Sequence, residues 1–255
     1  MLLSFDGASW NVWVGNGDGS LAGVWESGAG AGWAVGYGGA AYHWTSGSRG
    51  QATIASANLD AIWGASPTDV WVAGDAGTLL HGDGAAWTAT PSGTAEDLLC
   101  VWGSGANDVW VGGSNGTLLH WTGSSWGKVD AGVSAAVTAI WIQSAGDGWF
   151  GTSDGQLARW NGATWSLDAF APGFPVTGVW GSGANDVWAV GASVLGSDNP
   201  TLAHWDGAEW SRAADDPIPF GNLRAVWGAS ANDVWVVGDG PVGLSQFTIW
   251  RRHAP

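Results

Sequence analysis

The sequence predicts an all-β protein, a single six-bladed β-propeller of four-stranded antiparallel blades. A phrase that is cleanest at 99–126, LCVWGSGANDVWVGGSNGTLLHWTGSSW, recurs along the chain with a period near 40 residues, which is typical of repeat architectures. Each copy divides into four short apolar runs bounded by Gly, Asn, Asp or Ser, as strands joined by tight turns are. The runs are apolar on both faces, which favours small sheets covered on both sides by neighbouring blades.

Tryptophans mark the repeat. Four positions of the unit hold 22 of the 23 tryptophans, and Trp13 alone lies outside them. The first position recurs at spacings of 38, 39, 39, 39 and 47 residues, at Trp25, Trp63, Trp102, Trp141, Trp180 and Trp227. The third position is Gly82 in the second copy, and the fourth is Arg49 in the first copy. The high tryptophan content is therefore chiefly a property of the fold.

Taken in order, the copies define the blades. They are expected at 23–54, 60–94, 99–133, 138–170, 177–215 and 223–253, the last completed by 1–14. The opening MLLSFDGASW matches TLLHWTGSSW position for position, so the N-terminal hairpin can complete the last blade and remove its open edge. We expect Trp10–Val14 to be the fourth strand of that blade. Its third strand is either Leu2–Phe5 or Phe247–Trp250, a choice that stays open. No linker divides the chain, which is expected to be one domain.

The connections between strands differ in how much they vary from one repeat to the next. The turn between the first and second strands, as in SGANDVW, and the hairpin between the third and fourth, as in WDG, WTG and WNG, are nearly fixed in length. Both carry the Asp, Asn and Gly that tight turns require. The second-to-third and fourth-to-first connections vary freely, and in an antiparallel blade these two emerge on one rim. Because loops on a rigid scaffold usually carry function, we place the binding surface there.

Composition restricts the partners. The net charge is −15, from 7 basic and 22 acidic residues, which argues against nucleic acid and against anionic membranes. It permits cationic partners or calcium, although acidic loops also simply keep a tryptophan-rich protein soluble. The single cysteine, Cys100, forms no internal disulfide, and no Cys/His metal spacing occurs. No window approaches the roughly 18 apolar residues of a membrane span.

Two sets of polar residues recur on the fixed-length rim. An aspartate precedes the second tryptophan in four units, at Asp69, Asp108, Asp186 and Asp233. A histidine occupies one strand position in four units, at His43, His81, His120 and His204. A metal ring and a catalytic histidine are the functional alternatives. Repetition favours structure: the aspartates are expected to accept backbone N–H groups in the turn, and the histidines to pack in the core or at the blade edge.

Candidate ligand-binding residues lie on the variable rim. They follow the second strand or stand near a variable loop, and are Trp13, Tyr37, Asp75, Asn115, Asp154 and Asp239. Short Asp/Gly loops offer oxygen ligands for calcium or hydrogen bonds for sugar hydroxyls, and an exposed Trp13 would be a stacking platform for a sugar ring. Ordinary solvated turns and outer-strand packing are the alternatives. No metal site and no cofactor other than calcium is indicated.

Enzymatic propellers provide a test of the catalytic alternative. A sialidase-like site needs three convergent arginines, a tyrosine nucleophile and an acidic partner. The two tyrosines, Tyr37 and Tyr42, both lie in the first blade, and Arg159 occupies a repeat position. The strict Asp-box is not matched, and no G-x-S-x-G, H-E-x-x-H or P-loop pattern occurs. We therefore assign no catalytic residues and expect a protein that is not an enzyme.

The sequence of the repeat resembles that of repeats in a group of bacterial proteins. VWGSGANDVWVGG…GTLLHWTGSSW (101–126) and VWGSGANDVWAVG…LAHWDGAEW (179–210) look like the VWGSG-type repeats of secreted proteins and lipoproteins of myxobacteria and related bacteria, which are often described as BNR- or Kelch-like. The resemblance covers the whole chain and implies a propeller and an extracellular or cell-surface location, as part of a larger chain; no signal peptide is seen in this sequence. It implies no catalytic residues.

The sequence thus leads to three functional hypotheses. A non-catalytic recognition module that binds carbohydrate through the variable rim is the first. A scaffold for protein–protein interaction or assembly through the same rim is the alternative, and a degenerate glycoside-hydrolase-like propeller is the third. The fold resembles that of propeller lectins such as tachylectin-2 only in general style. The identity of the ligand and the oligomeric state stay open.

Overall fold

The computed structural model describes residues 2–5, 10–14, 20–28, 30–45, 48–193, 201–212, 222–239 and 247–253. The chain forms two compact units. The first is Met1–Val111 with Trp121–Trp126, and the second is Gly112–His120 with Gly127–Pro255. Within the described residues the regular structure is antiparallel β-sheet, with two three-residue 3-10 turns, η1 (Tyr37–Gly39) and η2 (Asp75–Gly77).

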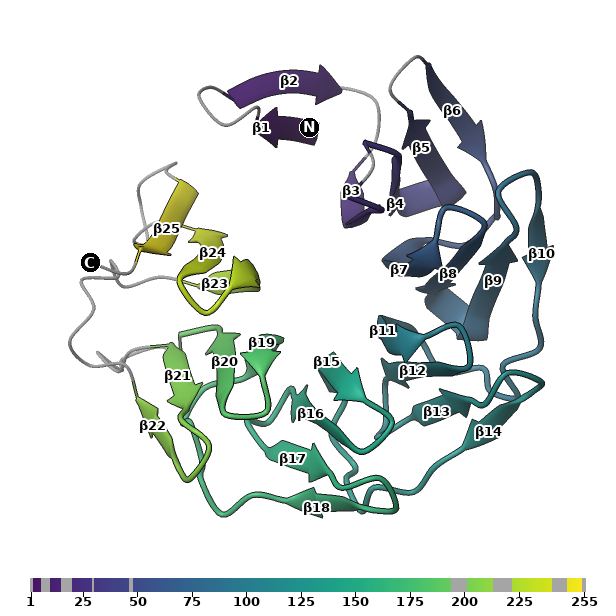
Figure 1. Cartoon of the computed structure of the whole chain (residues 1–255). Helices are drawn as coiled ribbons and strands as arrows, with labels where there is room; N and C mark the ends of the chain where they lie inside the picture. Colours follow the sequence, from purple (N-terminus) through teal and green to yellow (C-terminus); the bar gives the residue numbers. More distant parts are fainter. Residues whose placement is uncertain are drawn as a thin grey trace. The chain divides into compact units, whose positions relative to one another are not determined.

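Six sheets follow the repeat in order (Figure 1). Sheet 1 consists of β3 (Leu21–Glu26), β4 (Gly32–Gly36), β5 (Ala40–Trp44) and β6 (Arg49–Thr53). Sheet 2 consists of β7 (Leu59–Ser66), β8 (Asp69–Gly74), β9 (Thr78–Gly82) and β10 (Trp87–Ala89). Sheet 3 consists of β11 (Leu98–Gly105), β12 (Asp108–Gly113), β13 (Leu118–Trp121) and β14 (Trp126–Lys128).

The remaining sheets lie in the second unit. Sheet 4 consists of β15 (Val137–Ser144), β16 (Asp147–Thr152), β17 (Leu157–Trp160) and β18 (Trp165–Leu167). Sheet 5 consists of β19 (Val176–Gly183), β20 (Asp186–Gly191), β21 (Leu202–Trp205) and β22 (Trp210–Arg212). Sheet 6 consists of β23 (Leu223–Ser230), β24 (Asp233–Asp239) and β25 (Phe247–His253). Repeated four-stranded antiparallel sheets are therefore confirmed, and in the described residues sheet 6 has three strands.

The N-terminal strands pair with each other as a hairpin. β1 (Leu2–Phe5) pairs with β2 (Trp10–Val14), and in the described residues these two form a two-stranded sheet. Strands that follow each other closely pair readily through a short connection. The third strand of sheet 6 is β25, which pairs with β24 from Asp239↔Phe247 to Asp233↔His253. Closure into six blades therefore remains a prediction.

Tryptophan and glycine interlock neighbouring sheets within each unit. The tryptophan of the first strand lies over a glycine in the first strand of the next sheet, so that a Cβ on Gly181 would meet Trp141 Cη2 at 2.7 Å. The same arrangement pairs Trp25 with Gly64, Trp63 with Gly103, and Trp180 with Gly228. The close approach requires glycine because any side chain would displace the ring. Trp141 is 4% exposed, whereas Trp227 in the same position of sheet 6 is 56% exposed.

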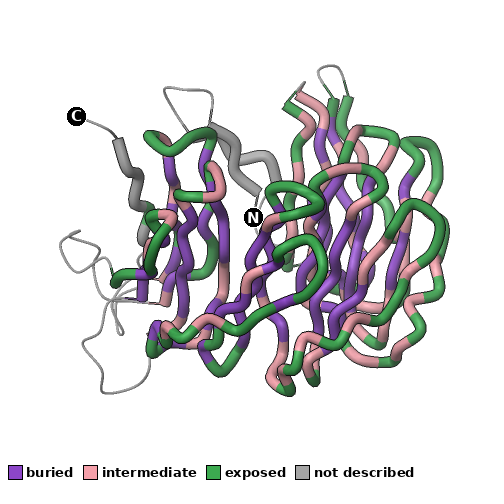
Figure 2. The backbone as a smooth tube through the Cα atoms, turned by 60° about the horizontal axis from the view of Figure 1, so that its bottom comes forward, coloured by how far each residue is buried: buried purple, intermediate pink, exposed green. Residues whose placement is uncertain are grey.

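The hairpins between third and fourth strands have the expected turn chemistry. Oδ1 of Asp206 accepts the backbone N–H groups of Ala208 and Glu209 at 2.8 and 2.9 Å, and Gly207 has a φ of 99°. Asp83 and Asn161 cap their hairpins in the same way. The donated N–H bonds lower the pKa of Asp206 and of Asp83. Figure 2 shows that the buried strands end in exposed turns.

Among the residues that the structure describes, no helix has the length and apolar character needed to cross a bilayer.

Candidate functional site

The turns of each sheet lie at the two ends of its strands. We call the end that carries the first-to-second and third-to-fourth turns the regular edge. The edge that carries the second-to-third turns and the connections to the next sheet is called the variable edge. The candidate residues from the sequence fall on both edges, and their contacts show which of them hold the fold.

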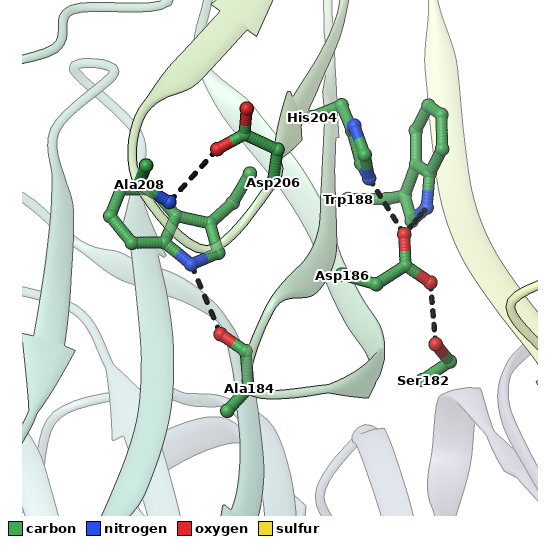
Figure 3. A network of polar contacts seen from close by, with 8 residues as sticks. Ser182, Ala184, Asp186, Trp188, His204, Asp206 and Ala208 are labelled. Atoms are coloured by element: carbon green, nitrogen blue, oxygen red, sulfur yellow. Dashed lines mark hydrogen bonds and ion pairs between the residues drawn. The ribbon is translucent and has the colours of Figure 1, made fainter.

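An aspartate organises the regular edge of sheet 5 (Figure 3). Asp186 Oδ1 accepts hydrogen bonds from His204 Nε2 at 2.6 Å and from Trp188 Nε1 at 3.2 Å, and Asp186 Oδ2 accepts one from Ser182 Oγ at 2.5 Å. Burial by itself would raise the pKa of Asp186, but the bonds from His204 and Ser182 hold it below its ordinary value. Ser182 and His204 both bond to the carboxylate and not to each other, so the group does not have the serine–histidine contact of a nucleophilic triad.

The same arrangement recurs in other sheets. Asp69 accepts from His81 Nε2 at 2.7 Å, and Asp147 accepts from Arg159 Nε at 3.0 Å. Asp108 accepts from Ser104 and Trp110. The prediction that these aspartates are structural agrees with this, but their partners are side chains rather than the backbone N–H groups we expected. A side chain from the third strand reaches the turn between the first and second strands because the second and third strands pair directly, as in Trp188↔His204.

The second-strand tryptophans sit inside this network. Trp71 stacks on His81 with ring centroids 4.3 Å apart, and Trp188 stacks on His204 at 4.1 Å. In sheet 4 the guanidinium of Arg159 replaces the imidazole and lies 5.6 Å from the Trp149 ring, which is a cation–π contact. The predicted packing role of the histidines is therefore seen at His81 and His204.

On the variable edge of the first unit, hydrogen bonds connect the turns of successive sheets. Asn58, directly before β7, accepts from Gly38 N at 2.9 Å and donates from Nδ2 to Asp75 Oδ2 at 2.7 Å. Asp97, directly before β11, accepts from Ala76 N at 2.9 Å. One polar side chain at the start of each first strand thus holds the turn of the preceding sheet. Reasoning from the sequence missed Asn58 and Asp97, although each stands directly before a Leu that begins a first strand.

Asn222 repeats this arrangement in the second unit. It accepts from Ser193 N at 3.0 Å through its side chain and from Asp239 N at 2.9 Å through its carbonyl. Asp239 Oδ2 also accepts a hydrogen bond from Arg224 Nη2 at 2.7 Å, in an exposed ion pair. In both units a polar side chain that precedes a first strand thus holds a described part of the variable edge.

The predicted binding residues lie in separate turns of this edge. Tyr37 is 54% exposed at the start of η1. Asn115 has a φ of 53° in the turn after β12, which suits its residue type. Asp154 accepts from Thr152 Oγ1 within its own turn. The side chain of Trp13 lies outside the described part of the structure. Among the described residues no three His, Cys, Asp or Glu side chains gather as a metal group, and the Asp75 and Asp239 carboxylates already accept internal hydrogen bonds.

Three carboxylates of the first unit lie close together on this edge. Burial, followed by the charges of Asp75 and Asp97, raises the pKa of Asp60 from its ordinary value of 3.8 to about 6. Asp60 Oδ2 is buried without a hydrogen-bond partner among the described residues. In sheets 4 and 5 the same position is threonine, and Thr138 Oγ1 donates to the Val176 carbonyl of the next sheet at 2.6 Å.

We expect Asp60→Thr to stabilise the protein in a pH-dependent way. Because the folded protein binds more protons than the unfolded chain between pH 4 and 6, the wild type loses stability as the pH rises through that window. The shift corresponds to roughly 3 kcal/mol at 1.36 kcal/mol per pKa unit, of which about half should be realised in a partly exposed group. The gain from Asp60→Thr should therefore be about 1.5 kcal/mol at pH 7 and should vanish near pH 4.

Urea denaturation at a series of pH values measures this gain. Asp130→Thr, at an exposed aspartate, is the matched control and should show no such pH dependence. A constant difference between Asp60→Thr and wild type from pH 4 to 7 would contradict the assignment.

A groove lies on the variable edge of sheet 2. Its volume is about 610 Å³, and it is lined by Gly77–Leu80 and by the connection Ala89–Ala95. Ser92 Oγ donates to the Gly77 carbonyl at 2.7 Å and fixes the connection against η2. Glu96 and Asp97 follow the lining directly, and Asp75 begins η2. The groove is thus open, and acidic residues adjoin its lining in the sequence.

Comparison with known proteins bears on the fold. No protein-family model matches the sequence, and no curated protein does. Among solved structures, a chain in the crystal structure of a mitotic checkpoint complex is similar, with a TM-score of 0.78 and 15% identity over 98% of this chain and 80% of that chain. The likeness is one of fold. It agrees with an all-β fold of repeated four-stranded antiparallel sheets.

Two YCF48 structures are less similar. YCF48 bound to a D1 peptide has a TM-score of 0.48 and 13% identity, over 93% of this chain and 94% of that chain. YCF48 from Cyanidioschyzon merolae has a TM-score of 0.48 and 15% identity, over 92% and 96%.

Proposed function

We propose that the protein is a non-catalytic recognition module that binds an extended, basic segment of a partner protein. The observation that carries this proposal is the open groove of about 610 Å³ on the variable edge of sheet 2. Its floor includes the buried Leu79 and Leu80, and carboxylates of Asp75, Glu96 and Asp97 stand beside it in the chain. A protein of net charge −15 attracts cationic segments and repels acidic ones.

Protein rather than carbohydrate is favoured as the ligand class. Several tryptophans with described side chains are engaged in contacts with other rings within and between sheets. Turns held by hydrogen bonds, as two turns of the first unit are, suit protein recognition because little ordering is required on binding. A chain of similar fold occurs in a mitotic checkpoint complex, which is a protein assembly. This supports the scaffold alternative from the sequence over the lectin hypothesis.

Selection from a phage-displayed library of random 12-residue peptides tests the proposal. We expect enriched peptides to carry net positive charge and to weaken at least tenfold when NaCl is raised from 0.05 to 0.5 M, as ion pairing to an acidic groove requires. Ala95→Arg places a cation at the groove lining and should weaken the same peptides at least tenfold.

Ala163→Arg is the matched control. Ala163 is an exposed residue of a hairpin on the regular edge, so the same substitution there should leave peptide binding within twofold. Enrichment of neutral or acidic peptides, or equal effects of the two arginines, would contradict the proposal. If no peptide is enriched while a glycan array gives binding to a defined sugar, the lectin hypothesis replaces it.

A further inference from the structure

The interface between sheets 1 and 2, in the first unit, has one indole ring fewer than two other interfaces between sheets. In the interface of sheets 2 and 3, Trp71 contacts Trp121 with centroids 5.0 Å apart at 54°, and Trp126 at 5.0 Å and 88°. In the interface of sheets 4 and 5, Trp149 contacts Trp205 at 5.1 Å and 54°, and Trp210 at 5.1 Å and 88°. Two indoles of the following sheet therefore cover each second-strand tryptophan in the same geometry.

The interface between sheets 1 and 2 keeps only one of these contacts. Trp33 meets Trp87 at 5.1 Å and 87°, which reproduces the edge contact. The position of Trp121 and Trp205 is Gly82 in sheet 2, so no indole extends from this position, and the ring of Trp87 stands 2.9 Å from the place that a Cβ on Gly82 would take. Trp33 is consequently only half-buried, whereas Trp71 and Trp149 are 1% and 0% exposed.

A cavity occupies the place of the missing ring. Its volume is about 180 Å³, and its lining includes Trp33, His43, Gly82 and Trp87. A cavity of about 150 Å³ with apolar walls is large enough to bind benzene. The space therefore fits one aromatic side chain, and Trp33 and Trp87 of its lining correspond to Trp71 and Trp126, which contact the Trp121 ring.

The cavity also offers the hydrogen bond that an indole needs. Trp121 Nε1 donates to the Ala106 carbonyl at 3.2 Å, and Trp205 Nε1 donates to the Ala184 carbonyl at 3.0 Å. Pro67 holds the equivalent place in the turn of sheet 2 and lines the cavity. No described residue donates a hydrogen bond to its carbonyl. An indole N–H would find an acceptor there at the position used in sheets 3 and 5.

We propose that this cavity is a second binding site, which receives the side chain of a tryptophan from a partner protein. The inserted ring would lie against Trp33, meet Trp87 and donate its N–H to the Pro67 carbonyl. It would complete in trans the contact that Trp121 and Trp205 make within the chain. The site is separate from the groove on the variable edge and does not depend on the function proposed for it.

Calorimetry with N-acetyl-L-tryptophanamide, a tryptophan in peptide-like form, tests the site. We expect binding of one molecule per chain to the wild type, with N-acetyl-L-leucinamide at least tenfold weaker. Gly82→Trp should abolish binding, because the chain then supplies the ring itself once the Trp87 ring has shifted from the new Cβ. Trp33→Leu, which removes the ring wall without filling the cavity, should weaken binding at least tenfold and decides the matter if Gly82→Trp does not fold.

A gain of binding provides the reverse test. Trp121→Gly recreates the vacancy between sheets 2 and 3, and we expect two molecules of N-acetyl-L-tryptophanamide to bind per chain. Equal binding by the wild type, Gly82→Trp and Trp33→Leu would overturn the site. Binding of free indole with no binding of the amide would overturn the protein partner in favour of a small indole compound.

Discussion

Trp149→Ala should lower the free energy of unfolding by about 3–5 kcal/mol, the range for a large aromatic residue removed from a packed core. Trp149 is 0% exposed. It contacts Trp205 and Trp210 of the next sheet and lies under the Arg159 guanidinium of its own sheet. One substitution thus removes contacts that hold sheet 4 together and join it to sheet 5. The remaining rings are too constrained by their strands to refill the space.

Chemical denaturation followed by far-UV circular dichroism measures this loss. Trp227→Ala is the matched control in the same unit, because Trp227 is 56% exposed and should cost about 1 kcal/mol or less. Comparable losses for the two variants would show that stability does not depend on the contacts between sheets 4 and 5.

Gly181→Ala should destabilise the protein by about 2–3 kcal/mol, the cost of forcing one extra carbon into a packed interface. The added Cβ would stand 2.7 Å from Trp141 Cη2 and 2.8 Å from the Asp186 carbonyl oxygen. The indole cannot retreat readily, because Trp141 is 4% exposed and surrounded. The main effect should be separation of sheets 4 and 5 rather than loss of either sheet.

Gly183→Ala, two residues along the same strand, is the control. A Cβ on Gly183 meets nothing closer than Gln143 Nε2 at 4.0 Å. Since alanine restricts the unfolded chain more than glycine does, this variant should be neutral or more stable by up to about 1 kcal/mol. Thermal unfolding of the pair should give shifts of opposite sign, and a loss of Tm in both variants would contradict the steric explanation.

The repeat period predicts the sheets well because each strand is specified locally by β-branched and aromatic residues and by the turn that ends it. The Asp206–Gly207 hairpin, for example, follows from two adjacent residues. The N-terminal hairpin of β1 and β2 agrees with the match of 1–10 to the end of a repeat, but its place in the last blade stays a prediction. Sequence similarity between repeats defines a strand's position in the unit but not its neighbour.

The candidate site was harder to predict for a different reason. Asp75 was proposed as a ligand for calcium or sugar, yet its carboxylate accepts from Asn58, a residue of another connection. The vacancy at Gly82 is visible in the sequence as a missing tryptophan. Its meaning depends on knowing that this position contacts the second-strand tryptophan of the preceding sheet, as Trp121 contacts Trp71. Such contacts between repeats are set by packing and not by the local sequence.

The interlock of tryptophan and glycine has a consequence for how such a chain can change its length. Sheets 2 and 5 each carry an indole that contacts a glycine of the next sheet and a glycine that receives the indole of the preceding one, as Trp180 and Gly181 of sheet 5 do. Both residues belong to the first strand of the repeat. Duplication or deletion of a whole repeat therefore rejoins an indole with a glycine and leaves the chemistry of the new junction unchanged. Gain or loss of part of a repeat would leave one of the two without its counterpart, so genetic variation in length is expected to proceed by whole sheets.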